Sequence, residues 1–276
     1  MTGVKRFLST GETRAGLALL LPLLAFALLA PAMFPGDPMA IVGEPLLRPF
    51  QNSAFPLGTD RLGRDVLAGL AHGARTSLLV GLAAALSALC VGAVIGTIAG
   101  FGGRLLDETL MRLTEAFQTV PAFLLALAFV SVIGPSLSSV VLAIALGAWP
   151  APARVARAEV LSIREKDYVA AARVVGKRPA QIAFIEILPN ALPPVLALSS
   201  VIVASAILIE AALSFLGLGD PNRVTWGGMI AEGRTVLRSA SYLSIIPGVA
   251  LVITVLAIYL LGEGAAKARL AKRSYV

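Results

Sequence analysis

The sequence predicts an all-α polytopic membrane protein with about six transmembrane helices. Of its 276 residues, 57% are hydrophobic and only 14% are charged. The mean hydropathy is +0.86, whereas about a quarter of the residues in a soluble domain are charged. A helix that crosses a bilayer needs about 20 mostly apolar residues, and several stretches of the chain provide them. The stretch 17–34 is apolar on every face, unlike the alternating strands of a β-barrel.

Hydropathy divides the chain into spans separated by more polar segments. The segment 35–74 is rich in Pro, Gly and Asp and too polar to span, so we expect it to form an outer loop. The first apolar run is longer than that of a secretory signal, which predicts an uncleaved helix. The predicted spans are 15–33, 77–100, 113–134, 137–152, 190–217 and 243–262.

The basic residues predict the orientation of these spans. An even number of spans places both termini on the same side of the membrane. Most of the 23 lysines and arginines lie in the segments that would then share the side of the termini. By the positive-inside rule this side is the cytoplasm. The sequence therefore predicts a multi-pass plasma-membrane protein with both termini cytoplasmic, and the net charge of +7 needs no nucleic acid to explain it.

The loop between the fourth and fifth spans, about 153–189, holds the densest charge in the chain. Gly176 is suited to end a helix, because a positive φ is often required there, and Pro179 soon follows as a stop. We therefore expect a short amphipathic helix on the cytoplasmic side. On pattern alone, it could rest on anionic lipid or dock a partner protein. Its apolar residues can share one side at helical spacing: Val160, Ile163, Tyr168, Ala171, Ala172 and Val175.

The same loop resembles the signature loop of ABC import permeases. That signature reads Glu-Ala-Ala, three residues, Gly, nine residues, Ile, one residue, Leu-Pro. Two positions depart from it, because Ala170 replaces the glutamate and Glu186 replaces the isoleucine. The matching positions are Ala170, Ala171, Ala172, Gly176, Glu186, Leu188 and Pro189.

Further motifs resemble the dipeptide/oligopeptide/nickel branch of these permeases, in the same order along the chain. The most discriminating motif is LGTDRLGRD within 55–81, because the signature loop described above occurs in many import permeases. Together the motifs cover most of residues 55–264, which divides the chain into 1–54, with the first helix, and a permease domain at 55–276. The others lie at 103–113, 207–219, 225–234 and 260–264.

This resemblance implies a type I-like ABC importer permease fold and a set of partners. The cytoplasmic loop would be a coupling helix that docks on an ATPase subunit, with Glu165, Asp167 and Tyr168 beside the signature alanines. The partners would be a second homologous permease, expected as a heterodimer, two ATP-binding subunits, an extracytoplasmic binding protein and membrane lipid. ATP and Mg would be used by the ATPase subunits, and no cofactor would be bound by this chain. The implied cargo is di- or oligopeptide, with nickel or opines as alternatives.

No catalytic or metal site is predicted. The sequence contains no phosphate-binding loop of the form Gly-x-x-x-x-Gly-Lys-Ser/Thr. His72 is the only histidine and Cys90 the only cysteine, and neither has neighbours at metal-ligand spacing. We therefore expect a transport subunit rather than an enzyme.

Glu210 is the most unusual ionisable residue, because it lies within a predicted span, where an unpaired charge is costly. It could line the translocation path, or it could be protonated or paired to hold the bundle together. Ser214, Gly217 and Gly219 end the same span and could form a flexible outer gate or a plain helix terminator.

Two other classes of protein remain as alternatives. An ion-coupled carrier or channel would contain intramembrane charge pairs, broken helices or inverted repeats, and the sequence offers chiefly Glu210. A membrane anchor without transport would tolerate mutation of the loop that contains Gly176.

Overall fold

The computed structural model describes residues 7–273, with side chains described as far as Ala268. This part of the chain is almost entirely helical and contains no β-strand beyond isolated bridges. The elements are α2 (Gly11–Met33), α3 (Val66–Phe101), α4 (Arg104–Thr119), α5 (Ala122–Ile133), α6 (Leu137–Ala148), α7 (Pro150–Ile163), α8 (Asp167–Val174), α9 (Pro179–Gln181), the π-helix η1 (Ile182–Ile187), α10 (Leu188–Ala197), α11 (Ser199–Phe215), α12 (Trp226–Arg234) and α13 (Tyr242–Arg273).

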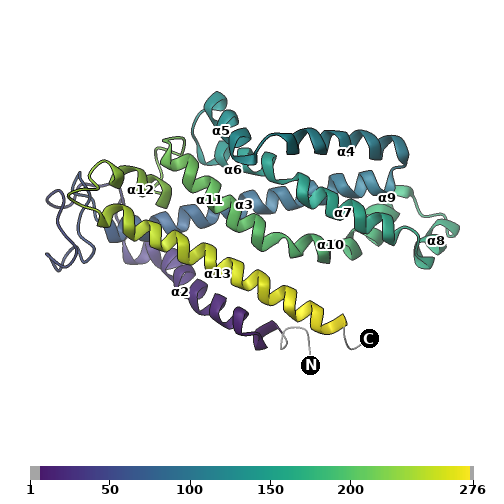
Figure 1. Ribbon diagram of the computed structural model, residues 1–276, viewed down its shortest axis with the longest axis horizontal. Helices are drawn as coiled ribbons and strands as arrows, with labels where there is room; N and C mark the ends of the chain where they lie inside the picture. The colour runs from purple at the N-terminus through teal and green to yellow at the C-terminus, as the bar shows by residue number, and fades with distance from the viewer. Residues whose placement is uncertain (1–6, 274–276) are drawn as a thin grey trace.

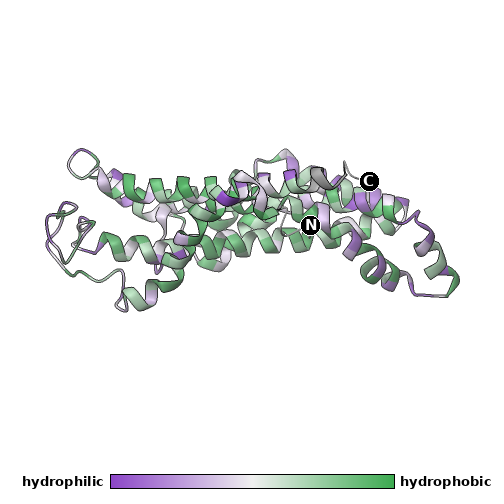
Figure 2. Cartoon of the chain, turned by 90° about the horizontal axis from the view of Figure 1, so that it is seen from below, coloured by the Kyte–Doolittle hydropathy of each residue, from purple (hydrophilic) through white to green (hydrophobic). Residues whose placement is uncertain are grey.

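The helices form an elongated bundle (Figure 1). The helix α3 runs through its middle, and α2 and α13 lie side by side along one edge. The short helix α8 lies at one end, and the irregular segment between α2 and α3 lies at the other. In Figure 2 hydrophobic residues dominate the long helices, whereas hydrophilic residues gather toward the two ends.

The structure confirms the predicted polytopic helical class. Four helices are long and apolar enough to cross a membrane, and the number rises to six if each of two bent helix pairs counts as one span. The first, second and sixth predicted spans fall within α2, α3 and α13. The helix α3 begins 11 residues earlier than predicted, because Asp65 caps its first turn by accepting a hydrogen bond from the backbone N–H of Leu67.

The third predicted span, 113–134, is wrong as a single helix. It is divided between α4 and α5, which meet at an angle of 86°. Pro121 lacks a backbone N–H and disfavours a helical Val120, which has φ −97° and ψ 127°. The helix α4 is amphipathic, and Thr114 is its only buried residue. The fourth predicted span is likewise bent by 46° between α6 and α7, where Pro150 begins a new helix.

The fifth predicted span, 190–217, has different boundaries in the structure. A membrane-length helical stretch runs over 179–197, and α11 follows as a shorter apolar helix. The two meet near Leu198, shortly after Pro193 and Pro194. Hydropathy missed the earlier start, because Glu186 and the polar residues around 177–181 precede the apolar run.

Glycines let α3 and α7 pack backbone to backbone. A Cβ at Gly92 would lie 2.6 Å from Cγ of Pro152, one at Gly96 would lie 2.3 Å from the carbonyl oxygen of Ala153, and one at Gly100 would also be too close to α7. Small residues at four-residue spacing permit this kind of close helix contact in membranes. The tight packing makes α3 and α7 one unit, and α7 leads directly to the turn that precedes α8.

Two arginines of α7 hold the amphipathic helix α4 beside this unit. The guanidinium of Arg157 forms a two-pronged ion pair with Asp107, and the distance from Nη2 to Oδ2 is 2.6 Å. Nη1 of Arg154 donates to Oε1 of Gln118 at 3.1 Å. Such paired hydrogen bonds between a guanidinium and a carboxylate fix orientation as well as distance.

Candidate functional site: the docking helix and a buried carboxyl

The predicted cytoplasmic helix is present, but it is shorter than the apolar pattern suggested. The helix α7 ends at Ile163, a turn follows, and α8 begins at Asp167. Nη1 of Arg164 holds this turn against α3 by donating to the carbonyl oxygen of Gly100 at 2.9 Å. The helix α8 therefore projects as a separate short element at the end of the bundle (Figure 1).

The predicted common apolar side from Val160 to Val175 is wrong. Val160 and Ile163 are buried on α7, but on α8 the buried residues are Val169 and Ala172. The turn between the helices changes the direction of the chain, so helical spacing counted across it does not describe one face. Three residues predicted to share the apolar side are exposed instead, namely Tyr168, Ala171 and Val175.

The predicted helix end at Gly176 is confirmed. Gly176 has φ +80°, and its N–H donates to the carbonyl oxygen of Arg173 at 3.0 Å. The N–H of Lys177 donates to the carbonyl oxygen of Ala172 at 3.1 Å. This pair of bonds is a Schellman motif, which favours glycine because an L side chain is strained at positive φ.

A small apolar core anchors α8 to its neighbours. Outside this core, the exposed Tyr168 contacts α10, because Nδ2 of Asn190 donates a hydrogen bond to its hydroxyl oxygen at 3.4 Å. Leu188 and Pro189 begin α10, and Leu188 is partly buried while Pro189 is exposed. Glu186, which departs from the family pattern, forms an ion pair with Lys177 just beyond α8. The core residues are Val160, Ile163, Val169, Ala172, Ile182, Ile187 and Ala191.

The outer surface of α8 combines exposed apolar and charged residues. Val174 is 88% exposed, Val175 78% and Tyr168 43%. Glu165 and Asp167 are exposed nearby, as are Ala170 and Ala171. Apolar side chains beside charges at the end of a membrane bundle are suited to an interface with another protein.

The second group of predicted residues lies far from α8, around Glu210 on α11. Glu210 is only 1% exposed. Its Oε1 accepts a hydrogen bond from the hydroxyl of Ser214 at 2.7 Å, and its Oε2 accepts one from Ser77 of α3 at 3.0 Å. The N–H of Trp226 in turn donates to Oγ of Ser77 at 3.3 Å. The carboxyl therefore links α11, α3 and the start of α12.

These contacts support the interpretation that Glu210 holds the bundle together. Within the described residues it forms no ion pair with a Lys or Arg, so neutral hydroxyl groups satisfy the carboxyl. A narrow hollow beside it is lined by Thr76, Leu137 and Asp220 among others. A role for Glu210 in the translocation path stays a prediction.

The two glycines near Glu210 have different structural tasks. Gly217 ends α11 with φ +81°, and the N–H of Leu218 donates to the carbonyl oxygen of Leu213 at 2.9 Å, which favours the terminator interpretation. A Cβ at Gly219 would lie 2.4 Å from Oγ of Ser214. Gly219 thus leaves room for the serine that binds Glu210.

Sequence reasoning missed Ser77, Trp226 and Thr225, whose side chain also forms a hydrogen bond with Glu210. Ser77 lies 133 residues from Glu210 in the chain, and a serine in an apolar run gives no signal of its partner. Cys90 is exposed on α3, and His72 contacts the carbonyl oxygen of Phe34 at 3.0 Å. Among the described residues no three His, Cys, Asp or Glu side chains are grouped to hold a metal ion.

Membrane-length helices with a short exposed helix, α8, at one end of the bundle define the chain as a polytopic membrane protein. Residues 92–272 match the family described as "Binding-protein-dependent transport system inner membrane component". This match covers more than half of the chain, and the chain belongs to this family.

Named relatives agree with this assignment. The chain is 39% identical over 255 residues to a di/tripeptide transport system permease protein of Pseudomonas aeruginosa, with 90% of this chain and 84% of that protein covered. It is 43% identical over 238 residues to a probable peptide ABC transporter permease protein of Sinorhizobium fredii, with 86% and 81% covered. It is 35% identical over 255 residues to a dipeptide transport system permease protein of Haemophilus influenzae, with 90% and 86% covered.

A solved structure shares the fold. The inward-facing MetNI methionine ABC transporter contains a chain that superimposes with a TM-score of 0.58 at 20% identity. The match covers 73% of this chain and 95% of that chain. The expected fold of an ABC importer permease is thereby confirmed.

Proposed function

We propose that this chain is the permease subunit of an ATP-driven importer that forms the translocation path for di- or oligopeptides. Its relatives from three genera are named as peptide or dipeptide permeases, and the matches include most of each protein. The LGTDRLGRD motif, at residues 57–65, supports the same branch of the family. An extracytoplasmic binding protein would deliver the peptide to the end of the bundle opposite α8.

The observation that carries the mechanism is the exposed surface of α8. Val174 and Val175 expose most of their apolar surface beside charged residues, at a hydrophilic end of the molecule. We infer that an ATPase subunit covers this surface, and that two such subunits serve this chain and a second homologous permease. The ATPase subunits bind ATP and Mg, and this chain holds no cofactor.

The close packing of α8, α7 and α3 gives the coupling a physical route. The core that contains Val160, Val169 and Ile187 fixes α8 to α7 and η1. The glycine contacts then fix α7 to α3. The helix α3 has 36 residues and is therefore about 54 Å long at 1.5 Å per residue. A displacement of α8 would move α3 as a rigid body and shift the balance between inward-facing and outward-facing states.

Position 170 carries a glutamate in the family signature but an alanine in this chain, and two nearby acidic residues can replace its negative charge. Asp167 lies one helical turn before Ala170, and Glu165 precedes α8 in the turn. Both side chains are exposed. We infer that they supply negative charge to the ATPase contact that a glutamate at position 170 makes in the family.

Uptake tests both the transport role and the cargo. Cells that lack the gene would receive either the wild-type chain or Gly176→Pro, and uptake of labelled dipeptide, labelled nickel and a labelled opine would be measured. Proline cannot adopt φ +80° and has no N–H for Arg173, so the end of α8 is lost. We expect the wild type alone to restore dipeptide uptake, with equal amounts of both chains in the membrane.

Three outcomes would contradict parts of the proposal. Rescue of nickel or opine uptake in place of dipeptide uptake would replace the cargo. Full rescue of uptake by Gly176→Pro would show that α8 has no coupling role, and it would favour a protein that functions without an ATPase. Uptake that follows the membrane potential and persists after ATP depletion would indicate an ion-coupled carrier.

A further inference from the structure

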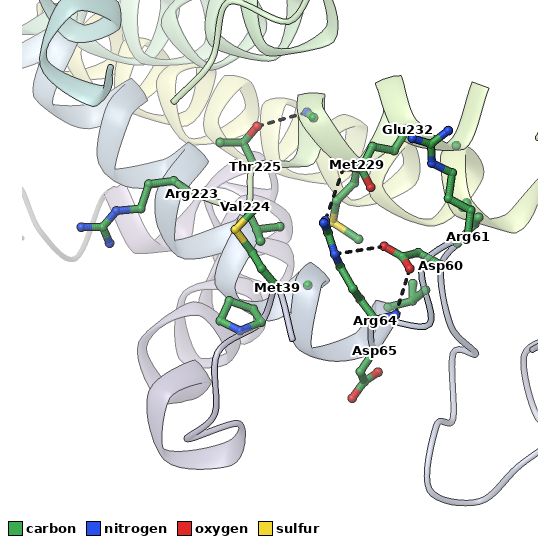
Figure 3. A pocket seen from close by; sticks show the side chains of 16 residues that line it. Met39, Asp60, Arg61, Arg64, Asp65, Arg223, Val224, Thr225, Met229 and Glu232 are labelled. Carbon is green, nitrogen blue, oxygen red and sulfur yellow. Dashed lines mark hydrogen bonds and ion pairs between the residues drawn. The ribbon is translucent and has the colours of Figure 1, made fainter. Parts of the chain in front are cut away.

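A pocket at the end opposite α8 has no role in the function proposed above. It lies between the loop that precedes α3, the segment that precedes α12, and α12 itself (Figure 3). It is a hollow that opens to solvent. The charged residues of its lining are Asp60, Arg61, Arg64, Asp65, Arg223 and Glu232.

Arg64 is the central charge of this pocket, and its hydrogen-bonding capacity is largely unused. A guanidinium has five N–H donors. In the structure Nη1 donates to Oε1 of Glu232 at 3.5 Å, and Nε lies 3.9 Å from Oδ2 of Asp60, too far for a hydrogen bond. Nε is buried and has no hydrogen-bond partner within the described residues. Nε is enclosed by protein atoms, so the donors that a ligand can reach are those of the two Nη groups, of which only Nη1 has a hydrogen-bond partner within the described residues.

Two of the nearby carboxylates are already engaged by the backbone. Oδ1 of Asp60 accepts from the N–H groups of Leu62 at 2.8 Å and of Arg64 at 2.9 Å. Oδ1 of Asp65 accepts from the N–H of Leu67 at 2.8 Å. These bonds fix the loop, and the carboxylate oxygens that remain paired with Arg64 are Oδ2 of Asp60 and Oε1 of the half-exposed Glu232.

The starts of two helices also border the pocket. Its lining includes Val66 and Gly69 in the first turns of α3, and Gly228 and Met229 in the first turn of α12. The N–H groups of Val66, Leu67 and Gly228 already have acceptors within the chain, so only the helix dipoles favour an anion here. Arg61 and Arg223 also line the pocket, although Arg223 extends away from Arg64 in Figure 3.

The remaining wall is apolar and adaptable. Met39, Val224, Met229 and Leu243 line it. Methionine side chains conform to neighbours of different shape. Three acidic residues in the same lining would oppose a doubly charged phosphate more strongly than a singly charged carboxylate.

We propose that this pocket binds the terminal carboxylate of a short peptide on the outer side of the membrane. Arg64 binds the carboxylate oxygens with its planar N–H donors, and the apolar wall accepts the side chain of the last residue. The choice of a peptide as ligand rests on the function proposed above. The pocket would hold the peptide at the mouth of the translocation path before it passes between the subunits.

Direct binding tests this proposal. The full chain, purified in lipid nanodiscs with the subunits that accompany it, would be titrated with alanyl-leucine and with its C-terminal amide by ligand-detected NMR. We expect the wild type to bind the free acid about tenfold more tightly than the amide, since the amide removes a charge-assisted pair of hydrogen bonds. Arg64→Gln should abolish this preference, and Arg64→Lys should retain part of it.

Glu232→Gln separates a ligand site from a merely structural ion pair. It removes one competitor for Arg64, so affinity for the free acid should rise severalfold. Arg238→Gln is the matched control, because Arg238 is an exposed arginine on the same side that does not line the pocket. It should bind like the wild type.

Equal binding of acid and amide by the wild type would overturn the proposal, and this comparison does not depend on any variant folding. Weaker binding by Glu232→Gln, or tighter binding of glycerol phosphate than of peptide, would also overturn it. If wild-type cells import dipeptide but the purified chain shows no acid preference, the pocket assignment fails and peptide import stands. If the preference is present but no dipeptide enters cells, peptide import fails and the pocket stands.

Discussion

Glu210 shows how one charged residue is accommodated inside this bundle. Both of its carboxyl oxygens accept hydrogen bonds from serine hydroxyls, one of them on another helix. A buried polar group is tolerated when its hydrogen bonds are made, and it becomes costly when a partner is removed. The residue therefore contributes to the stability of the bundle through the contacts that the structure shows.

Replacing Glu210 by Ala should destabilise the folded chain by about 1 to 3 kcal/mol, because Ser77 and Ser214 lose their shared acceptor. Glu210→Gln, which retains an oxygen acceptor, should cost less. Thermal unfolding in detergent, followed by calorimetry, measures both. Glu115→Ala is the control, since this glutamate is exposed on α4, and its effect should stay within about 0.5 kcal/mol. Equal melting temperatures for Glu210→Ala and the control would contradict the prediction.

The charges near α8 give a second prediction for single residues. Asp167→Asn should reduce copurification of the ATPase subunits severalfold, because it removes an exposed charge beside the proposed interface. Adding Ala170→Glu to this variant should restore copurification, since it returns the carboxylate of the family pattern. Asp37→Asn, an exposed aspartate on the outer segment, should have no effect. Failure of Ala170→Glu to restore binding would show that position 170 does not face the partner.

At the scale of elements, α3 and α7 pack backbone to backbone with no room for an added Cβ at three glycines of α3. The glycines of α3 bring its backbone against that of α7 over two turns. The break at Pro121 turns α5 by 86° from α4, and the break at Pro150 turns α7 by 46° from α6. The transmission that we propose from α8 would depend on this contact remaining rigid.

Gly96→Ala should lower the free energy of unfolding by about 1 to 3 kcal/mol, because the added Cβ would lie 2.3 Å from the carbonyl oxygen of Ala153. Gly248→Ala is the matched control within α13, where nothing lies within 4 Å of the added Cβ. Alanine is favoured over glycine in a helix by up to about 1 kcal/mol, so the control should be neutral or stabilising. Calorimetric unfolding in the same detergent compares the two. A neutral Gly96→Ala would show that the helices can separate without cost.

At the scale of the whole molecule, the exposed surface of α8 and the pocket around Arg64 lie at opposite ends of the bundle, since α12 and the segment before α3 lie at the end far from α8 (Figure 1). The start of α2 and the end of α13 lie near each other, as the ion pair between Glu12 and Lys267 shows. The proposed orientation places α8 in the cytoplasm and the segment between α2 and α3 outside.

Labelling of introduced cysteines checks this orientation. In a Cys90→Ser background, Ser53→Cys on the outer segment should react with a membrane-impermeant maleimide in intact spheroplasts. Val174→Cys, at an 88% exposed position on α8, should react only after the membrane is opened. The bilayer is the only barrier that distinguishes the two exposed sites. The reverse pattern would invert the proposed topology.

The sequence predicted the elements whose causes are local. Apolar runs of membrane length predicted α2, α3 and α13, and Gly176 predicted the end of α8, because only backbone chirality and hydropathy are involved. The phase of the apolar face on α8 was not predictable, since it depends on the turn at Arg164. Proline is a residue type that breaks helices, but the presence of Pro121 does not by itself give the angle of 86° between α4 and α5.

By itself the sequence determined the helical membrane class, and its motifs indicated the family that the comparisons then established. Only the tertiary structure joined Glu210 to Ser77, 133 residues away, and assembled the pocket around Arg64 from separate segments. The physical reason is the range of the interactions. Hydropathy and backbone strain act within a few residues, whereas hydrogen bonds and pockets depend on side chains that meet only when the helices pack.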